Sequence, residues 1–347
     1  MIVSWNGFTL HPRVPFTIAR GTLTKSERVH VRITEESEQP EGWGEAAPNA
    51  FYGESAATVH EALLRLFSPR LRAMTIESLD DIAALEEEMR GVIPEAASAR
   101  AAMSAAAHDL LGRKMGRPVF ELFGLDPNLA PPTSFTIAIP ESDADLARRI
   151  EEAHAYPILK VKLGTDRDEH LIRAIRRVAP RKVLRVDANA AWTVERAIAM
   201  GAFLAEQGVE LIEQPLPKDD IDGYWRLRGQ VPLPVFADES CIDSRDLPRL
   251  DGAVDGINIK LAKCGGLAEA RKMAIEARNR GMKVMLGCML ESSLGITAAA
   301  HLAPLVDYAD LDGAALVAND PFIGATIEGG VVRMPAGPGL GVLIRRT

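Results

Sequence analysis

Three acidic residues stand at positions where their chemistry could combine. Asp187, Glu213 and Asp238 each follow a short apolar run, and about 25 residues, one strand-and-helix unit, separate each from the next. Neighbouring parallel strands would bring the three carboxylates together, and a hard divalent cation such as Mg²⁺ would relieve their mutual repulsion. A single acid of this kind more often caps a helix or forms a surface ion pair. Three in register predict a metal site.

Lysines occur at two places that could serve the same site. In Lys160-Val161-Lys162 the period of two in a strand directs both ammonium groups to one side. If that side faces the site, each cation disfavours the other, and one lysine pKa falls toward the range of a general base. Lys263 follows the apolar run 256–259, and we expect it opposite Lys162 as a second base. A solvated strand face is the alternative, although parallel strands are usually covered on both sides.

Two bases with a cation between them define a reaction. A proton α to a carboxylate is weakly acidic, and a cation at the carboxylate oxygens stabilises the enediolate that its removal forms. One lysine on each face would remove the proton on one side and return it on the other. These residues predict inversion of a stereocentre by Lys162 and Lys263, with Lys160 assisting through its charge.

Eight short apolar runs would have to position these residues, and helical patterns separate them. The expected strands are Ser134–Ile139, Leu159–Leu163, Val183–Val186, Val209–Ile212, Val235–Ala237, Gly256–Ile259, Lys283–Leu286 and Tyr308–Leu311. Eight alternating strands and helices predict an α/β fold of the (β/α) barrel type, with active groups at the carboxyl ends of the strands. An open doubly wound sheet is the alternative, but its Gly-rich phosphate loop is missing.

The N-terminal part of the chain has a different pattern. Alternating stretches such as Val29–Ile33 predict a small antiparallel sheet, and the Ala-rich run Ala96–Leu111 predicts a helix. We expect three parts: an α+β capping domain at 1–125, the barrel with the active site at 126–320, and a C-terminal segment, 321–347, that returns to the cap.

Composition limits the classes of partner. With 40 basic and 48 acidic side chains, the chain offers no basic surface for nucleic acid or an anionic membrane. The three cysteines have no metal-ligand spacing and read as free thiols. The N-terminus lacks the pattern of a signal peptide, and no apolar run is long enough to span a membrane. We expect a cytoplasmic protein.

Together these motifs resemble the muconate-lactonising subgroup of the enolase superfamily over nearly the whole chain. They are Lys160-Val161-Lys162, Asp187-Ala188-Asn189, Glu213-Gln214-Pro215, Asp238-Glu239-Ser240 and the run from Asn258 to Gly266. The resemblance implies a barrel of the modified TIM type with one Mg²⁺ per active site. Within the subgroup the chain is most similar to the dipeptide epimerases.

The narrower resemblance implies substrate contacts. Asp310-Leu311-Asp312 follows the eighth strand, and in dipeptide epimerases this motif binds the α-amino group of the substrate, although Gly313 also allows a simple turn. Thr136 and the segment formed by Cys288, Met289 and Leu290 would line the pocket. Arg20, in a segment similar to the mobile capping loop of the family, would pair with an acidic side chain or anchor a hinge.

The resemblance leaves several functions open. An L-Ala-D/L-Glu dipeptide is the first expected substrate, which would connect the enzyme to cell-wall peptide recycling. A muconate cycloisomerase, an o-succinylbenzoate synthase or a racemase of N-acylated amino acids is the rival, but those substrates carry no free ammonium group for Asp310 and Asp312. A non-catalytic binding protein would have no need for three acids and paired lysines. Barrels of this family commonly self-associate, so the resemblance is compatible with a homo-oligomer and leaves the oligomeric state open.

Overall fold

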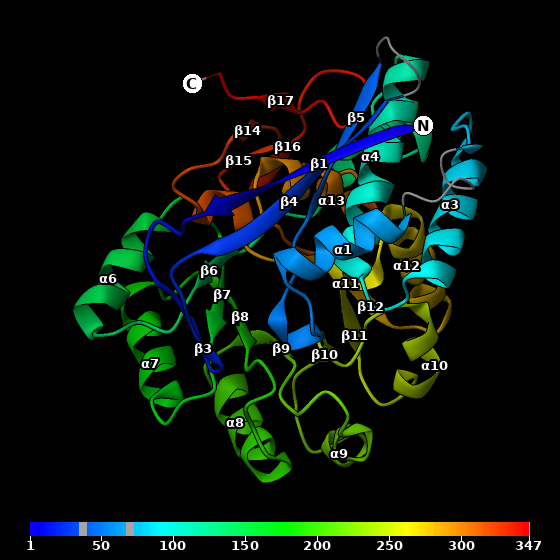
Figure 1. Cartoon of the computed structure of the whole chain (residues 1–347). Coiled ribbons are helices and arrows are strands. Elements are labelled where there is room, and N and C mark those ends of the chain that lie inside the picture. The colour runs from blue at the N-terminus through cyan, green and yellow to red at the C-terminus, as the bar shows by residue number, and fades with distance from the viewer. Residues whose placement is uncertain (35–39, 67–72, 347) are drawn as a thin grey trace.

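A ring of eight parallel strands lies at the centre of the computed structural model, which describes residues 1–34, 40–66 and 73–346 (Figure 1). The strands follow one another around the ring in chain order, and a parallel bridge between Thr133 and Ala309 joins its last strand to its first. They are β6 (Phe135–Ile137), β7 (Ile158–Lys162), β8 (Val183–Asp187), β9 (Val209–Glu213), β10 (Val235–Ala237), β11 (Gly256–Ile259), β12 (Lys283–Gly287) and β13 (Tyr308–Asp310). The predicted barrel and its eight strands are confirmed.

Helices cover the outside of the ring and connect successive strands (Figure 1). The main ones are α6 (Asp143–Glu152), α7 (Asp168–Val178), α8 (Val194–Glu206), α9 (Ile221–Leu227), α10 (Leu247–Leu250), α11 (Leu261–Cys264), α12 (Leu267–Asn279) and α13 (Ser293–Ala300). Several begin at side-chain caps: Ser142, for example, accepts a hydrogen bond from Asp145 N. The strands between them are buried on both faces, as parallel barrel strands require.

The interior of the ring holds an apolar cluster in its middle and charged side chains at the carboxyl ends of the strands. Leu211, Phe236 and Met285 pack with Tyr308 as one interior cluster. Two residues further along their strands, on the same inward side, stand Glu213 after Leu211 and Asp238 after Phe236. Apolar side chains therefore fill the barrel interior. Because inward positions recur every second residue, the next inward position on β9 and directly after β10 is a carboxylate at the carboxyl end of the strand.

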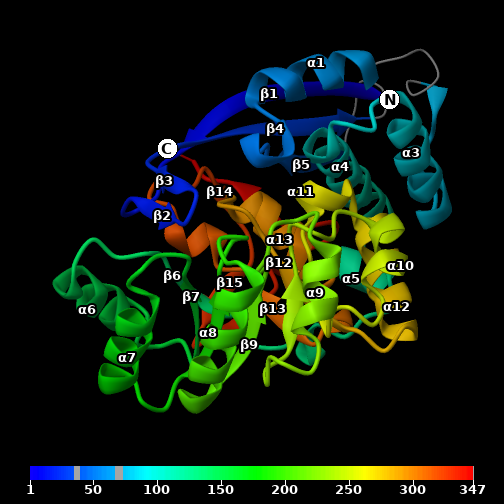
Figure 2. The same cartoon turned by 90° about the horizontal axis from the view of Figure 1, so that it is seen from below.

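A three-stranded antiparallel sheet lies over one side of the barrel (Figure 2). It consists of β1 (Ile2–Leu10), β4 (Ser26–Thr34) and β5 (Glu41–Ala46), and it packs with α1 (Ala56–Leu66), α3 (Leu79–Val92) and α4 (Ala97–Met115). A Cβ atom at Gly44 would lie 2.0 Å from Ala102 O, so glycine is what lets β5 pack directly on α4. Small residues at this contact make α4 the almost fully buried helix between cap and barrel.

Two short elements of the N-terminal part reach over the open end of the barrel. The hairpin β2 (Phe16–Ile18) and β3 (Gly21–Leu23) touches the barrel where Ile139 N donates to Thr17 O at 2.9 Å. The 3-10 turn η1 (Ala50–Tyr52) begins at an Asn49 cap. Both contribute residues to the cavity described below.

The chain ends on the cap side of the molecule. Short strands follow the barrel, namely β14 (Phe322–Ile323), β15 (Thr326–Glu328), β16 (Val331–Arg333) and β17 (Leu343–Ile344). Phe322 makes edge contacts with the rings of His30 and Trp43 in the capping sheet. Among the described residues, no helix has the length and apolar character needed to cross a membrane.

Candidate active site

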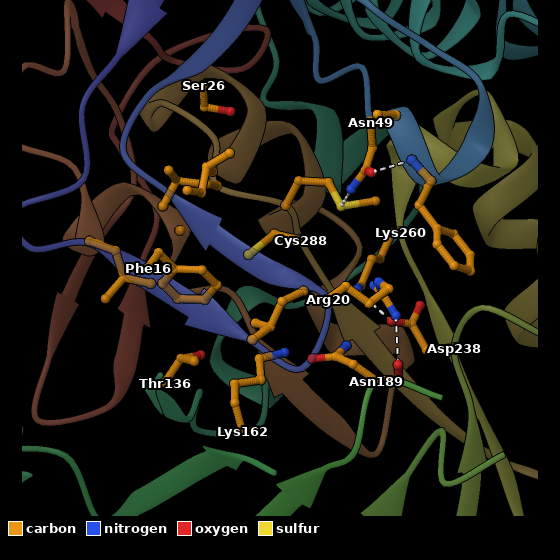
Figure 3. A pocket seen from close by; sticks show the side chains of 18 of the residues that line it. Phe16, Arg20, Ser26, Asn49, Thr136, Lys162, Asn189, Asp238, Lys260 and Cys288 are labelled. Atoms are coloured by element: carbon orange, nitrogen blue, oxygen red, sulfur yellow. Dashed lines mark hydrogen bonds and ion pairs between the residues drawn. The ribbon is translucent and has the colours of Figure 1, made fainter. Parts of the chain in front are cut away.

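A cavity of about 610 Å³ opens between the carboxyl ends of the strands and the capping elements (Figure 3). Barrel and cap both line it. Of the residues singled out in the sequence, those in its lining are Arg20, Thr136, Lys162, Asp238, Cys288, Met289, Leu290, Asp310 and Asp312. Lys160, Asp187 and Glu213 lie directly beneath that lining, and Lys263 lies behind Asp238 and does not reach the cavity.

The three predicted carboxylates meet at the floor of the site. One oxygen from each of Asp187, Glu213 and Asp238 lies within 4.8 Å of the others, and all three side chains are buried. Burial raises the pKa of Glu213 to about 7, although Lys160 opposes the shift. For Asp238 burial is outweighed by Lys260 and Lys263, so its pKa is lowered.

Donors after β8 and on β11 hold these carboxylates. Asn189 N donates to Asp187 Oδ1 at 2.8 Å, and Asn258 Nδ2 donates to Glu213 Oε1 at 2.9 Å. Asn189 and Gln214 both have positive φ angles, 46° and 38°, which residues other than glycine adopt uncommonly. Among the residues that the structure describes, none makes a well-aligned hydrogen bond to the buried Glu213 Oε2, which instead forms an ion pair with Lys160 Nζ at 2.7 Å. Positive φ beside two of the acids and a buried oxygen balanced only by a cationic neighbour fit a site built for positive charge.

Lys160 and Lys162 point to the same side, as the strand period predicted. Lys162 Nζ lies 2.6 Å from Asp187 Oδ2 and lines the cavity. Lys160 Nζ lies deeper, 2.7 Å from Glu213 Oε2 and 2.6 Å from Asp310 Oδ2. Burial disfavours the Lys160 ammonium, but Asp310 and Glu213 outweigh burial and raise its pKa well above the ordinary value. The expected fall of a lysine pKa is therefore not found at Lys160, because the carboxylates around it offset the neighbouring cation.

The structure does not place Lys263 opposite Lys162. Lys263 stands in α11, and its Nζ is enclosed by four oxygens, including Asp238 Oδ1 at 2.6 Å and Cys241 O at 2.9 Å. Lys260, which sequence reasoning missed, lines the cavity and lies 2.7 Å from Asp238 Oδ2. Its signal was the strand alternation itself: Asn258 points inward to Glu213, so the second residue after it also points inward.

Lys162 and Lys260 therefore flank the three acids. Along the ring, Lys162 stands on β7, the acids on β8, β9 and just after β10, and Lys260 just after β11. Figure 3 shows the two lysines reaching the cavity from different sides. A substrate carbon held over the acids would have one lysine on each side.

Asp310 and Asp312 lie next to this group, at the end of β13. Asp310 accepts hydrogen bonds from Ser134 Oγ and Lys160 Nζ, both at 2.6 Å, while Asp312 accepts one from Thr136 N at 2.6 Å. Burial and the Asp310 charge raise the pKa of Asp312 to about 7. At Asp310 burial opposes ionisation, but Lys160 and Lys162 together with the hydrogen bonds lower the pKa to about 2. The pair offers negative charge to a cation at the cavity wall.

Arg20 enters the cavity from the loop between β2 and β3. Its Nη1 donates to Glu239 Oε1 at 2.6 Å and to Asn189 O at 2.8 Å, and its guanidinium lies 4.3 Å from the Phe51 ring centroid. Among the described residues, Nη1 alone of its nitrogens has a hydrogen-bond partner, so the Nε and Nη2 edge is left for a ligand. Cys288 lines the same cavity, with Sγ 3.3 Å from Asp310 O.

An acidic triad at the carboxyl end of a (β/α) barrel, under an α+β cap, is the arrangement of the enolase superfamily. Two family models match the chain. Residues 6–124 match the mandelate racemase / muconate lactonizing enzyme N-terminal domain, and residues 142–347 match the enolase C-terminal domain-like model. The chain belongs to this family of the enolase superfamily.

Relatives narrow the class to epimerases. The chain is 40% identical to the L-Ala-D/L-Glu epimerase of Bacteroides thetaiotaomicron, over 97% of this chain and 86% of that one. It is 38% identical to the L-Ala-D/L-amino acid epimerase of a Maribacter species over the full length of both. The dipeptide epimerase of Cytophaga hutchinsonii, solved with Mg and D-Ala-L-Val, superposes with a TM-score of 0.92 at 30% identity, covering 100% and 97%. The protein is an isomerase of the epimerase kind.

Proposed function

We propose that this enzyme is a Mg²⁺-dependent dipeptide epimerase that inverts the α-carbon of the C-terminal residue. The observation that carries the proposal is one constellation in one cavity. Three buried carboxylates are flanked by Lys162 and Lys260, and a second acidic pair stands beside them.

Asp187, Glu213 and Asp238 would hold the metal ion. Their donor set is all oxygen, with one carboxylate oxygen of each acid within 4.8 Å of the others, which suits a hard divalent cation. When bound, Mg²⁺ supplies Lewis-acid stabilisation of the negative charge on the substrate carboxylate. Solved relatives of the chain hold Mg, which supports the assignment.

Lys162 and Lys260 would exchange the α-proton. The lysine in the amine form takes the proton from one face, and the electron pair of the C–H bond passes into the enediolate. The lysine in the ammonium form returns a proton to the other face, so the product is the epimer and the two lysines have exchanged states. Lys260 replaces Lys263 in this role because only Lys260 reaches the cavity. Lys160 would hold Glu213 and Asp310 in place by its charge.

Asp310 and Asp312 would bind the α-ammonium group of the dipeptide. Two carboxylates at one wall, one of them tied to Thr136 N, present negative charge at a fixed distance from the reacting carbon. A muconate cycloisomerase, an o-succinylbenzoate synthase or an N-acylamino acid racemase has no use for this pair. The pair is the feature that favours a dipeptide over those substrates.

The first expected substrate is L-Ala-D/L-Glu. The free Nε and Nη2 edge of Arg20 could bind a γ-carboxylate with two parallel hydrogen bonds, while Glu239 and the Phe51 ring keep the guanidinium in place. Cell-wall peptide recycling would be the process served. If Arg20 only anchors the loop, other L-Ala dipeptides are equally suitable, as the name of the Maribacter relative suggests.

Three further expectations stay proposals. The division into 1–125, 126–320 and 321–347 is in keeping with the two parts seen in the fold. A cytoplasmic location suits the free thiols of Cys241, Cys264 and Cys288. A homo-oligomer is the third.

The test is a dipeptide library incubated with the enzyme and Mg²⁺ in D₂O. A mass gain of one unit in the C-terminal residue of L-Ala-L-Glu and its neighbours is expected. N-acetylated copies of the same dipeptides serve as controls and should exchange far more slowly. Exchange of the acetylated compounds alone would contradict a dipeptide substrate and favour the racemase alternative.

A further inference from the structure

The segment Cys288–Leu290, which we call the pocket wall, is held by residues of the capping domain. Arg28 of β4 donates from Nε and Nη2 to Leu290 O at 2.9 and 2.6 Å, and from Nη1 to Glu27 O at 2.8 Å. All three nitrogens of the guanidinium are thus engaged. The Arg28 side chain is 4% exposed and also borders the cavity, so it joins the capping sheet to the wall.

Glu45 of β5 holds the residues that directly follow the wall. Its carboxylate accepts hydrogen bonds from Ser292 N at 3.1 Å, from Ser292 Oγ and from Gly295 N at 3.4 Å. These are groups at the start of α13, where unpaired N–H groups favour an anion. Arg28 Nε lies 3.8 Å from Glu45 Oε1, so the two side chains form one buried pair.

The wall also has an internal brace. Glu291 Oε1 accepts from Met289 N at 2.7 Å, and Asn49 Nδ2 lies 3.7 Å from Met289 Sδ. A Cβ at Gly295 would lie 2.3 Å from Glu291 Oε2, so the helix makes room for this carboxylate. The wall is therefore fixed at Met289 and Leu290, and just beyond it at Ser292, by side chains whose hydrogen bonds do not involve the two lysines or the acidic triad.

The position of the wall tells which part of the substrate it meets. Cys288 Sγ is 3.3 Å from Asp310 O, so the wall begins beside the acidic pair proposed to hold the α-ammonium group. The side chain nearest that group in a dipeptide belongs to the N-terminal residue. Met289 and Leu290 consequently limit the space open to that side chain.

We propose that Arg28 and Glu45 are positioning residues that set the selectivity for the N-terminal residue of the dipeptide. The inference rests on the proposed function. Because both act through the wall and touch neither lysine nor the acidic triad, their loss moves the wall and leaves proton exchange in place. A looser wall admits larger N-terminal side chains and holds alanine less well.

The chain contains a matched control. Glu86 of α3 is also a buried carboxylate of the cap that holds the start of a barrel helix: it accepts from Ala268 N at 3.0 Å and from Glu269 N at 2.9 Å at α12. Burial raises the pKa of both Glu45 and Glu86 to about 7. Glu86 does not line the cavity. A Glu86→Gln variant thus shows the effect of losing one buried carboxylate between capping domain and barrel when the pocket wall is not involved.

The experiment compares kcat and KM for L-Ala-L-Glu and L-Leu-L-Glu in the wild type, Glu45→Gln, Arg28→Met, Arg28→Lys and Glu86→Gln. We expect Glu45→Gln and Arg28→Met to raise KM for the alanine dipeptide and to shift the ratio of kcat/KM values toward the leucine dipeptide by about fivefold or more, the scale on which pocket size discriminates side chains. Arg28→Lys should recover part of the ratio. Glu86→Gln should lose thermal stability with an unchanged ratio.

Two results overturn the inference in distinguishable ways. An active wild type whose ratio is unchanged in Glu45→Gln and Arg28→Met would show that these residues stabilise the fold only. A wild type that exchanges no dipeptide would overturn the proposed function as well.

Discussion

Lys260 and Lys263 hold the two oxygens of one carboxylate: Lys260 Nζ lies 2.7 Å from Asp238 Oδ2, and Lys263 Nζ lies 2.6 Å from Asp238 Oδ1. The first lysine faces the cavity and the second is sealed behind the acid. The two lysines, three residues apart, therefore have different roles. Lys260 can contact a substrate, whereas Lys263 holds the proposed metal ligand Asp238 on the side away from the cavity.

Lys263→Met is expected to lower stability rather than to remove one face of the exchange. The substitution leaves Asp238 Oδ1 and three backbone carbonyls without their buried donor. Breaking a buried pair from one side costs about 3–5 kcal/mol. Thermal unfolding measures the loss, with Lys260→Met as the control, because water in the cavity can replace that ammonium. Equal losses in the two variants would contradict the division of roles.

The affinity for the substrate should depend on the ionisation of Asp312. Its pKa is raised to about 7 by burial and by Asp310, and only the ionised carboxylate attracts an ammonium group. As the pH falls through 7, Asp312 gains a proton and KM should rise. Above a pH of about 8 the dipeptide amine loses its own charge, and KM should rise again.

The pH profile of KM checks this, with Asp312→Asn as the comparison. The variant should bind more weakly at pH 7.5 and lose the rise in KM below 7. A wild-type KM that is constant between pH 5.5 and 7.5 would speak against an ammonium at this carboxylate.

Addition of Mg²⁺ should stabilise the folded enzyme. A ligand that binds the native state at 100 times its Kd adds about 2.7 kcal/mol to the free energy of unfolding. We expect millimolar MgCl₂ to raise Tm by several degrees and EDTA to reverse the rise. Glu213→Gln should abolish the response, since it removes one of three charged ligands. A similar rise in the variant would place the ion elsewhere.

Close packing of the cap on the barrel should make Gly44 intolerant of a side chain. A Cβ there would lie 2.0 Å from Ala102 O, a backbone atom of α4 that cannot move alone. Gly44→Ala should therefore cost about 3 kcal/mol or more. Gly91→Ala in α3 is the control, because its Cβ would meet nothing within 4 Å and alanine favours a helix. Unchanged stability in Gly44→Ala would contradict the described contact.

Features of this fold that depend on local sequence patterns could be predicted, and those that depend on distant contacts could not. Strand alternation and spacing are local, so the eight strands and the convergence of Asp187, Glu213 and Asp238 could be predicted. Whether Lys260 or Lys263 reaches the cavity depends on where β11 ends and α11 begins, and the spacing of the two lysines in the sequence does not give that boundary.

Other site features depend on pairings far apart in the chain. Glu239 holds Arg20 across 219 residues, and Asp310 pairs with Lys160 across 150. The second pairing helps to raise the pKa of Lys160, because the sequence shows two neighbouring cations but not the acids that the barrel brings to them. The periodic patterns that identify helices and strands give no information about such long-range contacts.

The most direct measurement is exchange of the α-proton in D₂O by Lys162→Ala and Lys260→Ala, each supplied separately with L-Ala-L-Glu and L-Ala-D-Glu. We expect neither variant to epimerise, and each to incorporate deuterium from one epimer only, with opposite preference, because one base remains on one face. Full epimerisation by Lys260→Ala, or exchange from both epimers in either variant, would contradict a two-lysine mechanism at this site.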